Sequence, residues 1–256
     1  MRTTAFLLAI VGLPALTANS AQAFEMPKDE AAAQFVSSNV VATLYHELGH
    51  GLIDVLQLPV LGREEDAADS LSALLTHEIW DEDSATQIIY DTAYAYSAYA
   101  QEADQGGWEL AYADTHSLDL QRYYNLVCQF YGADPEVRQD VADELELPAE
   151  RAEGCADEFA LMSESWGGIL SGLTPTAQTK GLVLVGADTA TDPIAAILAE
   201  EITALNENLG LPQEITVSVA ECGEANAYYA PDDRSITICT EYAPEMLRLY
   251  KLSRSQ

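Results

Sequence analysis

The feature that most constrains this chain is a pair of histidines set four residues apart in an otherwise apolar segment. His46 and His50 belong to the run HELGH (46–50), within residues 31–56, where apolar residues recur at helical spacing. Residues four apart share one face of a helix, so two imidazole nitrogens there can bind one ion at about 2.0–2.1 Å. Two neutral histidines without partners would be costly in a buried helix. The segment therefore predicts a buried helix that carries a metal ion; the alternative is a pair of core histidines with other partners.

Glu47 follows the first histidine and is expected beside the open position of the metal. A carboxylate there can take a proton from a zinc-bound water molecule, whose acidity the metal has raised, and hand it to the leaving amine. H-E-x-x-H is the pattern of zinc hydrolases that use this chemistry. It predicts that Glu47 is the general base.

The third metal ligand is expected on the next helix. Residues 57–62 contain the Pro and Gly that end the first helix, and a second amphipathic helix then opens with acidic residues. Glu65 and Asp69 match the E-x-x-x-D pattern of glutamate-type zincins. Because they share a face, Glu65 can bind zinc while Asp69 accepts the free N–H of a ligating histidine. Glu64 and Asp69 are alternative ligands, and a solvated acidic face is the structural alternative.

These segments resemble a family of exported bacterial zinc metallopeptidases known mainly as a domain of unknown function. The resemblance is carried by HELGHGLIDVLQLPVLGREEDAAD (46–69), HSLDLQRYYNLVCQFYGADP (116–135) and ECGEANAYYAPDDRSITICTEY (221–242). It covers nearly all of the chain after residue 23. The resemblance implies a zincin-like metallopeptidase, and its inference stops at that reaction class.

The first 23 residues have the pattern of a signal peptide. Arg2 precedes an apolar run at 5–16, and Ala21-Gln22-Ala23 has the small-x-small form of a cleavage site. The apolar run is too short for a stable membrane span, and no later stretch is long enough. We therefore expect cleavage near Ala23 and export to the periplasm or the medium, with an uncleaved anchor as the alternative.

The rest of the chain, 24–256, is expected to form one zincin-like domain of the α+β class, mainly α. Its helical part spans 24–170, and a Gly- and Pro-containing loop then leads to an α/β part at 176–256. The last predicted element is a β-hairpin over 226–239. The metal helix pair and this small C-terminal sheet define the expected fold.

Four cysteines follow the signal sequence, an even number in an oxidising compartment. Two disulfides are therefore expected. Of the three pairings we favour Cys128–Cys155 and Cys222–Cys239, because each joins neighbours across one hairpin of helices or strands. A cysteine zinc site is the alternative, but no C-x-x-C spacing supports it.

The chain is strongly acidic, with 42 Asp and Glu against 11 Lys and Arg and a net charge of −31. Such a surface repels nucleic acid and anionic lipid and favours solubility in salt-rich surroundings. The expected partner is a peptide or protein substrate, without nucleic acid and without stable insertion in a membrane.

Weaker signals suggest further site residues. His116 is the first choice for a donor to the oxyanion of the tetrahedral intermediate, with Arg122 and Tyr123 as alternatives. Asn226 and Ala227 resemble the edge strand on which thermolysin-like zincins bind an extended peptide, and Tyr123 is a further candidate for substrate binding. The alternatives are a structural hairpin and ordinary tyrosine packing. His77 is interpreted as structural.

The sequence thus predicts a peptidase in which His46, His50 and Glu65 bind one Zn²⁺ ion and Glu47 activates the zinc-bound water. The main alternative is a zinc-containing periplasmic binding or inhibitory protein without catalytic activity. A weaker alternative is a metal-dependent amidase that acts on cell-wall peptides.

Overall fold

The computed structural model describes residues 24–107 and 109–253. The predicted signal peptide lies outside these residues. The first half is helical, as follows: α1 (Glu30–Val55), α2 (Glu64–Ile79), α3 (Glu82–Gly106), α4 (Asp119–Ala133), α5 (Gln139–Glu144), α6 (Ala149–Ala152), α7 (Cys155–Met162), the π-helical turn η1 (Ser163–Gly167) and α8 (Gly168–Leu170). The second half is mixed: β1 (Leu182–Leu184), α9 (Pro193–Asn208), β2 (Ile215–Ala220), β3 (Ala227–Ala230), β4 (Ser235–Cys239) and α10 (Tyr242–Ser253).

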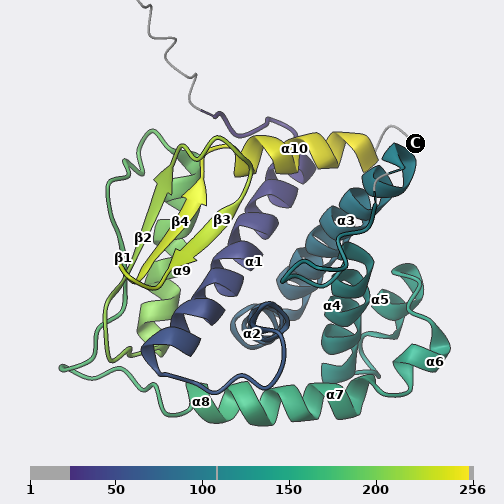
Figure 1. The fold of residues 1–256 in the computed structure, drawn as a ribbon, viewed down its shortest axis with the longest axis horizontal. Coiled ribbons are helices and arrows are strands. Elements are labelled where there is room, and N and C mark those ends of the chain that lie inside the picture. Colours follow the sequence, from purple (N-terminus) through teal and green to yellow (C-terminus); the bar gives the residue numbers. More distant parts are fainter. Residues whose placement is uncertain (1–23, 108, 254–256) are drawn as a thin grey trace, which may run out of the picture.

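Helix α1 lies between the two halves (Figure 1). Its N-terminus is capped by Asp29, whose carboxylate accepts the backbone N–H of Ala31 at 3.0 Å. The helix contacts α2 and α3 on one side and α9, β3 and β4 on the other. This explains why apolar residues cover most of its circumference, since a helix packed on all sides must be apolar nearly all round. Any side chain in the middle of α1 is thereby held rigidly.

Helices α1 and α2 approach each other unusually closely near the HELGH run. A Cβ atom on Gly49 would lie 2.8 Å from the Cα atom of Ala68. Only glycine at this position lets the two backbones come together. The close approach brings the first turn of α2 beside the histidines of α1.

The four strands form one sheet in the order β1-β2-β4-β3. β1 pairs with β2 and β2 with β4 in parallel, whereas β3 pairs with β4 antiparallel, with Ala227 opposite Ile238. Helix α9 makes the crossover between β1 and β2 and packs on both strands. The predicted fold class, α+β and mainly α, is confirmed. β3 is left at the edge of the sheet, next to α1.

The prediction that the C-terminal hairpin is the last element is wrong. Helix α10 follows it and packs on α1 and α3, burying Ala243, Met246 and Leu249. The region after α4 consists of the short helices α5, α6 and α7, and Leu147 and Pro148 lie between α5 and α6. Helix α10 also brings Tyr242 against α1, where its hydroxyl lies 2.6 Å from Oγ1 of Thr43.

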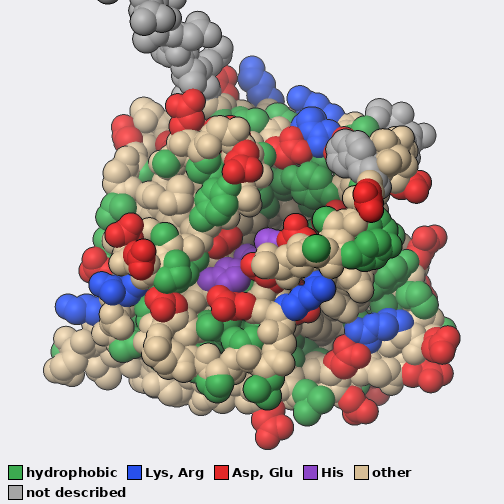
Figure 2. All heavy atoms as spheres, in the orientation of Figure 1, with side chains coloured by type: hydrophobic (Ala, Val, Ile, Leu, Met, Phe, Trp, Pro, Cys, Tyr) green, Lys and Arg blue, Asp and Glu red, His purple; other side chains and the backbone are tan. Residues whose placement is uncertain are grey.

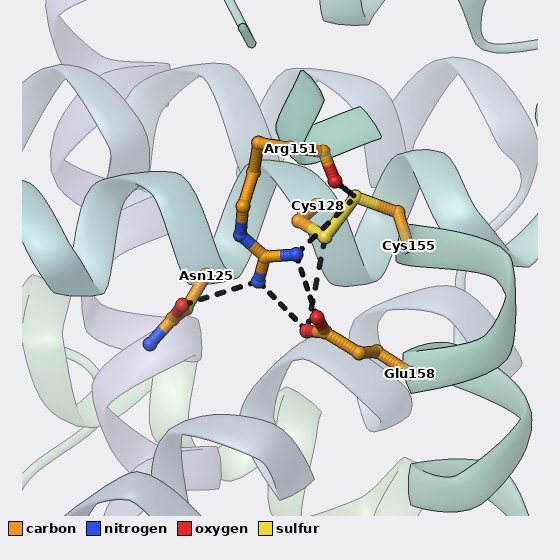
Figure 3. Close-up of a disulfide and its surroundings, with 5 residues drawn as sticks. All are labelled: Asn125, Cys128, Arg151, Cys155 and Glu158. Carbon is orange, nitrogen blue, oxygen red and sulfur yellow. Dashed lines mark hydrogen bonds and ion pairs between the residues drawn. A yellow bond between two sulfur atoms is a disulfide. The ribbon is translucent and has the colours of Figure 1, made fainter. Parts of the chain in front are cut away.

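Two disulfides form in the expected pairing. Cys128 of α4 is bonded to Cys155 at the start of α7, and Cys222 is bonded to Cys239 at the end of β4. Figure 3 shows the first bridge beside the ion pair of Arg151 and Glu158, whose closest atoms are 2.7 Å apart. All four cysteines are thus used structurally. In the described part of the chain, no helix is both long and apolar enough to span a membrane.

Candidate metal centre

The C-terminal half of α1 brings three polar side chains to one wall of a cleft. His46 and His50 lie on one face of the helix, and Glu47 is the next residue round it. His46 and Glu47 are buried, with 8 % and 6 % of their surface exposed. The two imidazole rings meet edge to face, with their Nε2 atoms 3.2 Å apart. Both rings therefore present Nε2 to the same small space.

Glu65 enters this space from the first turn of α2. Its Oε2 atom lies 3.2 Å from Nε2 of His46 and 3.2 Å from Nε2 of His50. The three ligand atoms thus form a nearly equilateral triangle. The structure brings together the three residues that the sequence analysis selected as ligands, and it gives Glu65 rather than Glu64 or Asp69 the position facing both histidines.

This triangle fits a metal ion. Tetrahedral zinc with bonds of about 2.0–2.1 Å holds its ligand atoms about 3.3–3.4 Å apart, close to the distances found here. Two histidines and one glutamate are also a donor set of catalytic zinc sites, which leave a fourth position open. The distances between the ligand atoms and the types of the three residues are therefore both compatible with a zinc ion.

The second nitrogen of each ligand histidine is held by a carboxylate. Nδ1 of His46 lies 2.8 Å from Oδ1 of Asp69, and Nδ1 of His50 lies 2.8 Å from Oε1 of Glu64. A carboxylate at Nδ1 favours the tautomer that leaves Nε2 free to bind a metal. Asp69 thus lies at Nδ1 of His46, in contact with a proposed ligand histidine as expected. The equivalent contact of Glu64 with His50 was not predicted, since it depends on how α2 packs against α1.

Asp69 is itself held by a half-buried arginine, Arg122. Nε and Nη2 of Arg122 donate to the two carboxylate oxygens at 2.8 and 2.7 Å, and the guanidinium lies over the ring of Tyr96. Burial acts to raise the pKa of Asp69, but Arg122 and the hydrogen bond with His46 outweigh it and hold that pKa well below its ordinary value. Asp69 is therefore ionised. Arg122 is directed to Asp69, so its alternative role as an oxyanion donor is not supported.

The electrostatics of the triangle depend on these partners. Burial acts to lower the pKa of His46, but the hydrogen bonds with Asp69 and Glu65 raise it to about 9. Burial acts to raise the pKa of Glu65, yet hydrogen bonds with the surrounding histidines hold it far below its ordinary value. A cation that binds here must displace protons from the histidines.

Glu47 differs from Glu65. Burial raises the pKa of its carboxyl group above the ordinary value, and the nearby His46 and His50 only partly oppose this effect. A raised pKa suits a carboxylate that must both accept and return a proton near neutral pH. The surroundings of Glu47 thus shift its pKa in the direction opposite to that of Glu65.

His116 reaches the same place from the loop before α4. Its Nε2 atom lies 3.0 Å from Oε2 of Glu65, and the ligand atoms of His46, Glu65 and His116 all fall within 4.8 Å of one another. The hydrogen bond with Glu65 raises the pKa of His116. Unlike the helical histidines, it is exposed, with 44 % of its side-chain surface accessible.

The cluster opens into a cleft. A cavity of about 570 Å³ is lined by the ligands and by the residues of β3, and a larger one of about 960 Å³ adjoins it and shares Asp114, His116 and Asn226. Figure 2 shows histidine side chains in a hollow on this face of the molecule. Asn226 and Ala227, predicted to line a substrate groove, are both in the wall of the first cavity.

Two other residues lie elsewhere. The prediction that Tyr123 contributes to the groove is wrong: its hydroxyl donates to the carbonyl of Leu145 at 2.8 Å, and its ring packs in the core formed by α3, α4 and α5. Its place on α4 turns it away from the cleft. His77 lies 3.0 Å from the guanidinium of buried Arg138 and packs on Phe159, in agreement with a structural role.

Comparison with known families agrees with this site. Residues 13–170 and 193–256 match a family model described as "Putative metallopeptidase". The chain belongs to this metallopeptidase family. The match includes the segments that carry the histidines, Glu65 and the β3–β4 hairpin. Comparisons with curated proteins and with solved structures gave no match.

Proposed function

We propose that this family member is an exported zinc-dependent peptidase. The observation that carries the proposal is the triangle of His46, His50 and Glu65, whose ligand atoms are 3.2 Å apart, with buried Glu47 beside it. The two disulfides suit an oxidising compartment and so support export.

The protein side chains have separate tasks in this mechanism. When bound, zinc lowers the pKa of a water molecule and polarises the carbonyl of the peptide bond. Glu47 accepts the proton that the attacking water loses and passes it to the amine that leaves. Asp69 and Glu64 keep the two ligand histidines in the required tautomer through their Nδ1 atoms. His116 donates a hydrogen bond to the oxygen on which negative charge develops.

The substrate is proposed to bind as an extended strand beside β3. This strand is at the edge of the sheet and lines the cleft. In an antiparallel pair, backbone groups point alternately towards and away from the partner strand, and Cys239 N–H bonds the carbonyl of Asn226. The carbonyl of Ala227 therefore points away from β4. An extended peptide can pair there through its backbone.

The central test is Glu47→Gln. We expect this variant to bind one zinc ion per chain, as the parent does, and to lose turnover of a peptide library by a factor of about 10² or more, because it has no base. Metal content is measured by elemental analysis and cleavage by mass spectrometry, with and without chelator. Equal cleavage by parent and variant would refute the mechanism.

The second candidate is a zinc-containing exported protein that binds or inhibits a partner without hydrolysis. It is favoured by the closeness of His116 to Glu65, because a fourth protein ligand would close the site. The two candidates are separated by zinc affinity in His116→Ala. As the proposed peptidase donor, His116 can be removed with little loss of affinity; as a fourth ligand, its removal weakens binding markedly.

A further inference from the structure

His116 belongs to the ligand cluster and yet lies on a loop. The ligand residues stand on α1 and α2, whereas His116 comes from the connection between α3 and α4 and its side chain is 44 % exposed. A loop of this kind moves more than the helices that it joins. Holding His116 in one place therefore requires anchors, because a group displaced by about 1 Å can lose most of its catalytic effect.

The structure contains such anchors on both sides of His116. Its backbone N–H donates to Oδ1 of Asp114 at 2.9 Å, and its carbonyl accepts from Nη1 of Arg63 at 3.0 Å. The next residue, Ser117, accepts from the same Nη1 atom at 3.2 Å and donates to Oδ1 of Asp66 at 2.7 Å. The backbone N–H and the carbonyl of His116 are thus both held by hydrogen bonds, and so is the side chain of the next residue.

Two of these anchors come from the turn that also supplies the metal ligand. Arg63 is the N-cap residue of α2, and Asp66 lies in the first turn of that helix, as Glu65 does. Glu65 points to the histidines while its neighbours hold the loop. Any shift of this turn would move the ligand and His116 together, so their separation is preserved.

We propose that Arg63, Asp66 and Ser117, the His116 clamp, are positioning residues for the hydrolytic reaction. They do not touch the substrate. They hold the loop so that the imidazole of His116 stays above Glu65, at the distance from which it reaches the reacting carbonyl. The inference rests on the proposed peptidase function and adds three residues to its machinery.

The test uses zinc-loaded full-length protein. Ser117→Ala removes the hydroxyl that joins the loop to α2, and Asp66→Ala removes its acceptor. We expect each variant to lower kcat by about 10-fold, with KM and zinc content near those of the parent. Asp66→Asn and Ser117→Thr keep an acceptor and a hydroxyl, respectively, and are expected to restore most of the activity.

A double-mutant cycle with His116→Ala separates positioning from general stability. If the clamp acts through His116, Ser117→Ala has no further effect on kcat once His116 is absent. Ser165→Ala is the control, because the hydroxyl of Ser165 also donates a 2.8 Å hydrogen bond, to the carbonyl of Leu161, and Ser165 lines neither cavity of the cleft. An undiminished effect of Ser117→Ala in the His116→Ala background would overturn the proposal, as would unchanged kcat in both clamp variants.

Amide hydrogen exchange of residues 114–118 gives a second measurement that needs no turnover. We expect exchange to be faster in Ser117→Ala and Asp66→Ala than in the parent or Ser165→Ala. If the zinc-loaded parent cleaves no peptide, the peptidase function fails, and faster exchange would still support the clamp. Unchanged exchange in the clamp variants would exclude it in either case.

Discussion

At the scale of single residues, the proposed ligands are held by side chains that are not themselves proposed ligands. Asp69 illustrates this, because it lies between His46 and Arg122 and bonds to both. Removing the charge of such a partner commonly costs 10- to 100-fold in metal affinity. The effect arises because the imidazole becomes a weaker donor and its orientation is less well fixed.

We therefore predict that Asp69→Asn lowers zinc affinity by about 10- to 100-fold while the protein stays folded. The asparagine oxygen can still accept from His46, but its amide nitrogen faces the guanidinium of Arg122. Competition titration with a chromophoric chelator measures the affinity. Asp157→Asn, an exposed site on α7, is the control. Parent-like affinity in Asp69→Asn would show that His46 needs no ionised partner.

A buried carboxyl group on α3 is expected to make the free energy of unfolding depend on pH. Asp91 of α3 is 5 % exposed and accepts hydrogen bonds from Ser38 at 2.7 Å and Gln87 at 2.9 Å. Burial raises its pKa from 3.8 to about 6, although these hydrogen bonds oppose the shift. The neutral form is favoured by the fold. Its contribution to stability is complete below about pH 4 and is lost as the pH rises through about 6.

The prediction concerns the difference between Asp91→Asn and the parent. Asparagine stays neutral at both pH values, whereas Asp91 ionises. The free energy of unfolding of Asp91→Asn, relative to that of the parent, should therefore increase by up to about 2–3 kcal/mol between pH 4 and pH 7. The Ser38 hydroxyl can rotate to suit the amide. Urea unfolding at the two pH values gives the difference. A difference that does not change with pH would mean that Asp91 is ionised throughout.

At the scale of helices and strands, the contact between α1 and α2 places Glu65 beside the two histidines. Gly49 makes this contact, one residue before His50 and opposite Ala68. No ligand needs to be altered in order to disturb the triangle, because moving α2 also moves Glu65. The distance between the two helices therefore sets how far Glu65 lies from the two histidines.

Gly49→Ala is predicted to weaken zinc binding by at least about 10-fold and to destabilise the fold by about 1–3 kcal/mol, since the added methyl group meets backbone atoms that cannot rotate away. Calorimetric titration and thermal unfolding measure the two effects. Gly168→Ala is the matched control, as a helical glycine with open space around it. If both variants behave alike, the close approach is not what positions Glu65.

Much of the arrangement of α1 and α2 could be predicted from the sequence, because it depends on the spacing of residues within each helix. The four-residue spacing of His46 and His50 fixes a shared face on any helix, and the same holds for Glu65 and Asp69. The contacts of Glu64 with His50 and of Arg122 with Asp69 were not predicted, because they depend on how separate helices rotate and pack. Tyr123 shows the same difficulty, since the rotation of α4 about its axis determines whether this side chain faces the cleft or the core.

The sheet and the final helix lie further from what sequence patterns determine. β2 and β4 pair in parallel although β3 intervenes in the chain, and no local signal encodes that order. Helix α10 buries Ala243, Met246 and Leu249 against α1 and α3. That spacing of three and three was available in the sequence, but the segment is short and its stability comes from tertiary packing.

At the scale of the whole molecule, the net negative charge is expected to limit thermal stability. With a net charge of −31, the folded chain repels itself, and salt screens this repulsion over a distance that falls from about 8 Å at 0.15 M to about 3 Å at 1 M. We predict that the midpoint of thermal unfolding rises by several degrees, about 5 °C, between about 0.05 and 1 M sodium chloride. Choline chloride should act equally if the effect is screening. A midpoint that falls with both salts would show that self-repulsion does not limit stability.

The two disulfides give the molecule an uneven reinforcement. One fastens α4 to α7 on the helical side, and the other fastens the chain after β2 to the end of β4. Neither crosses α1, so the two sides are joined by packing on that helix, by hydrogen bonds such as that of the Tyr229 hydroxyl with Asp54, and by the ion pair of Arg248 with Glu102. Reduction by a thiol should therefore loosen the helical side and the sheet side independently. A protease would then cleave these two sides first, and α1, which carries His46 and His50, would be cleaved last.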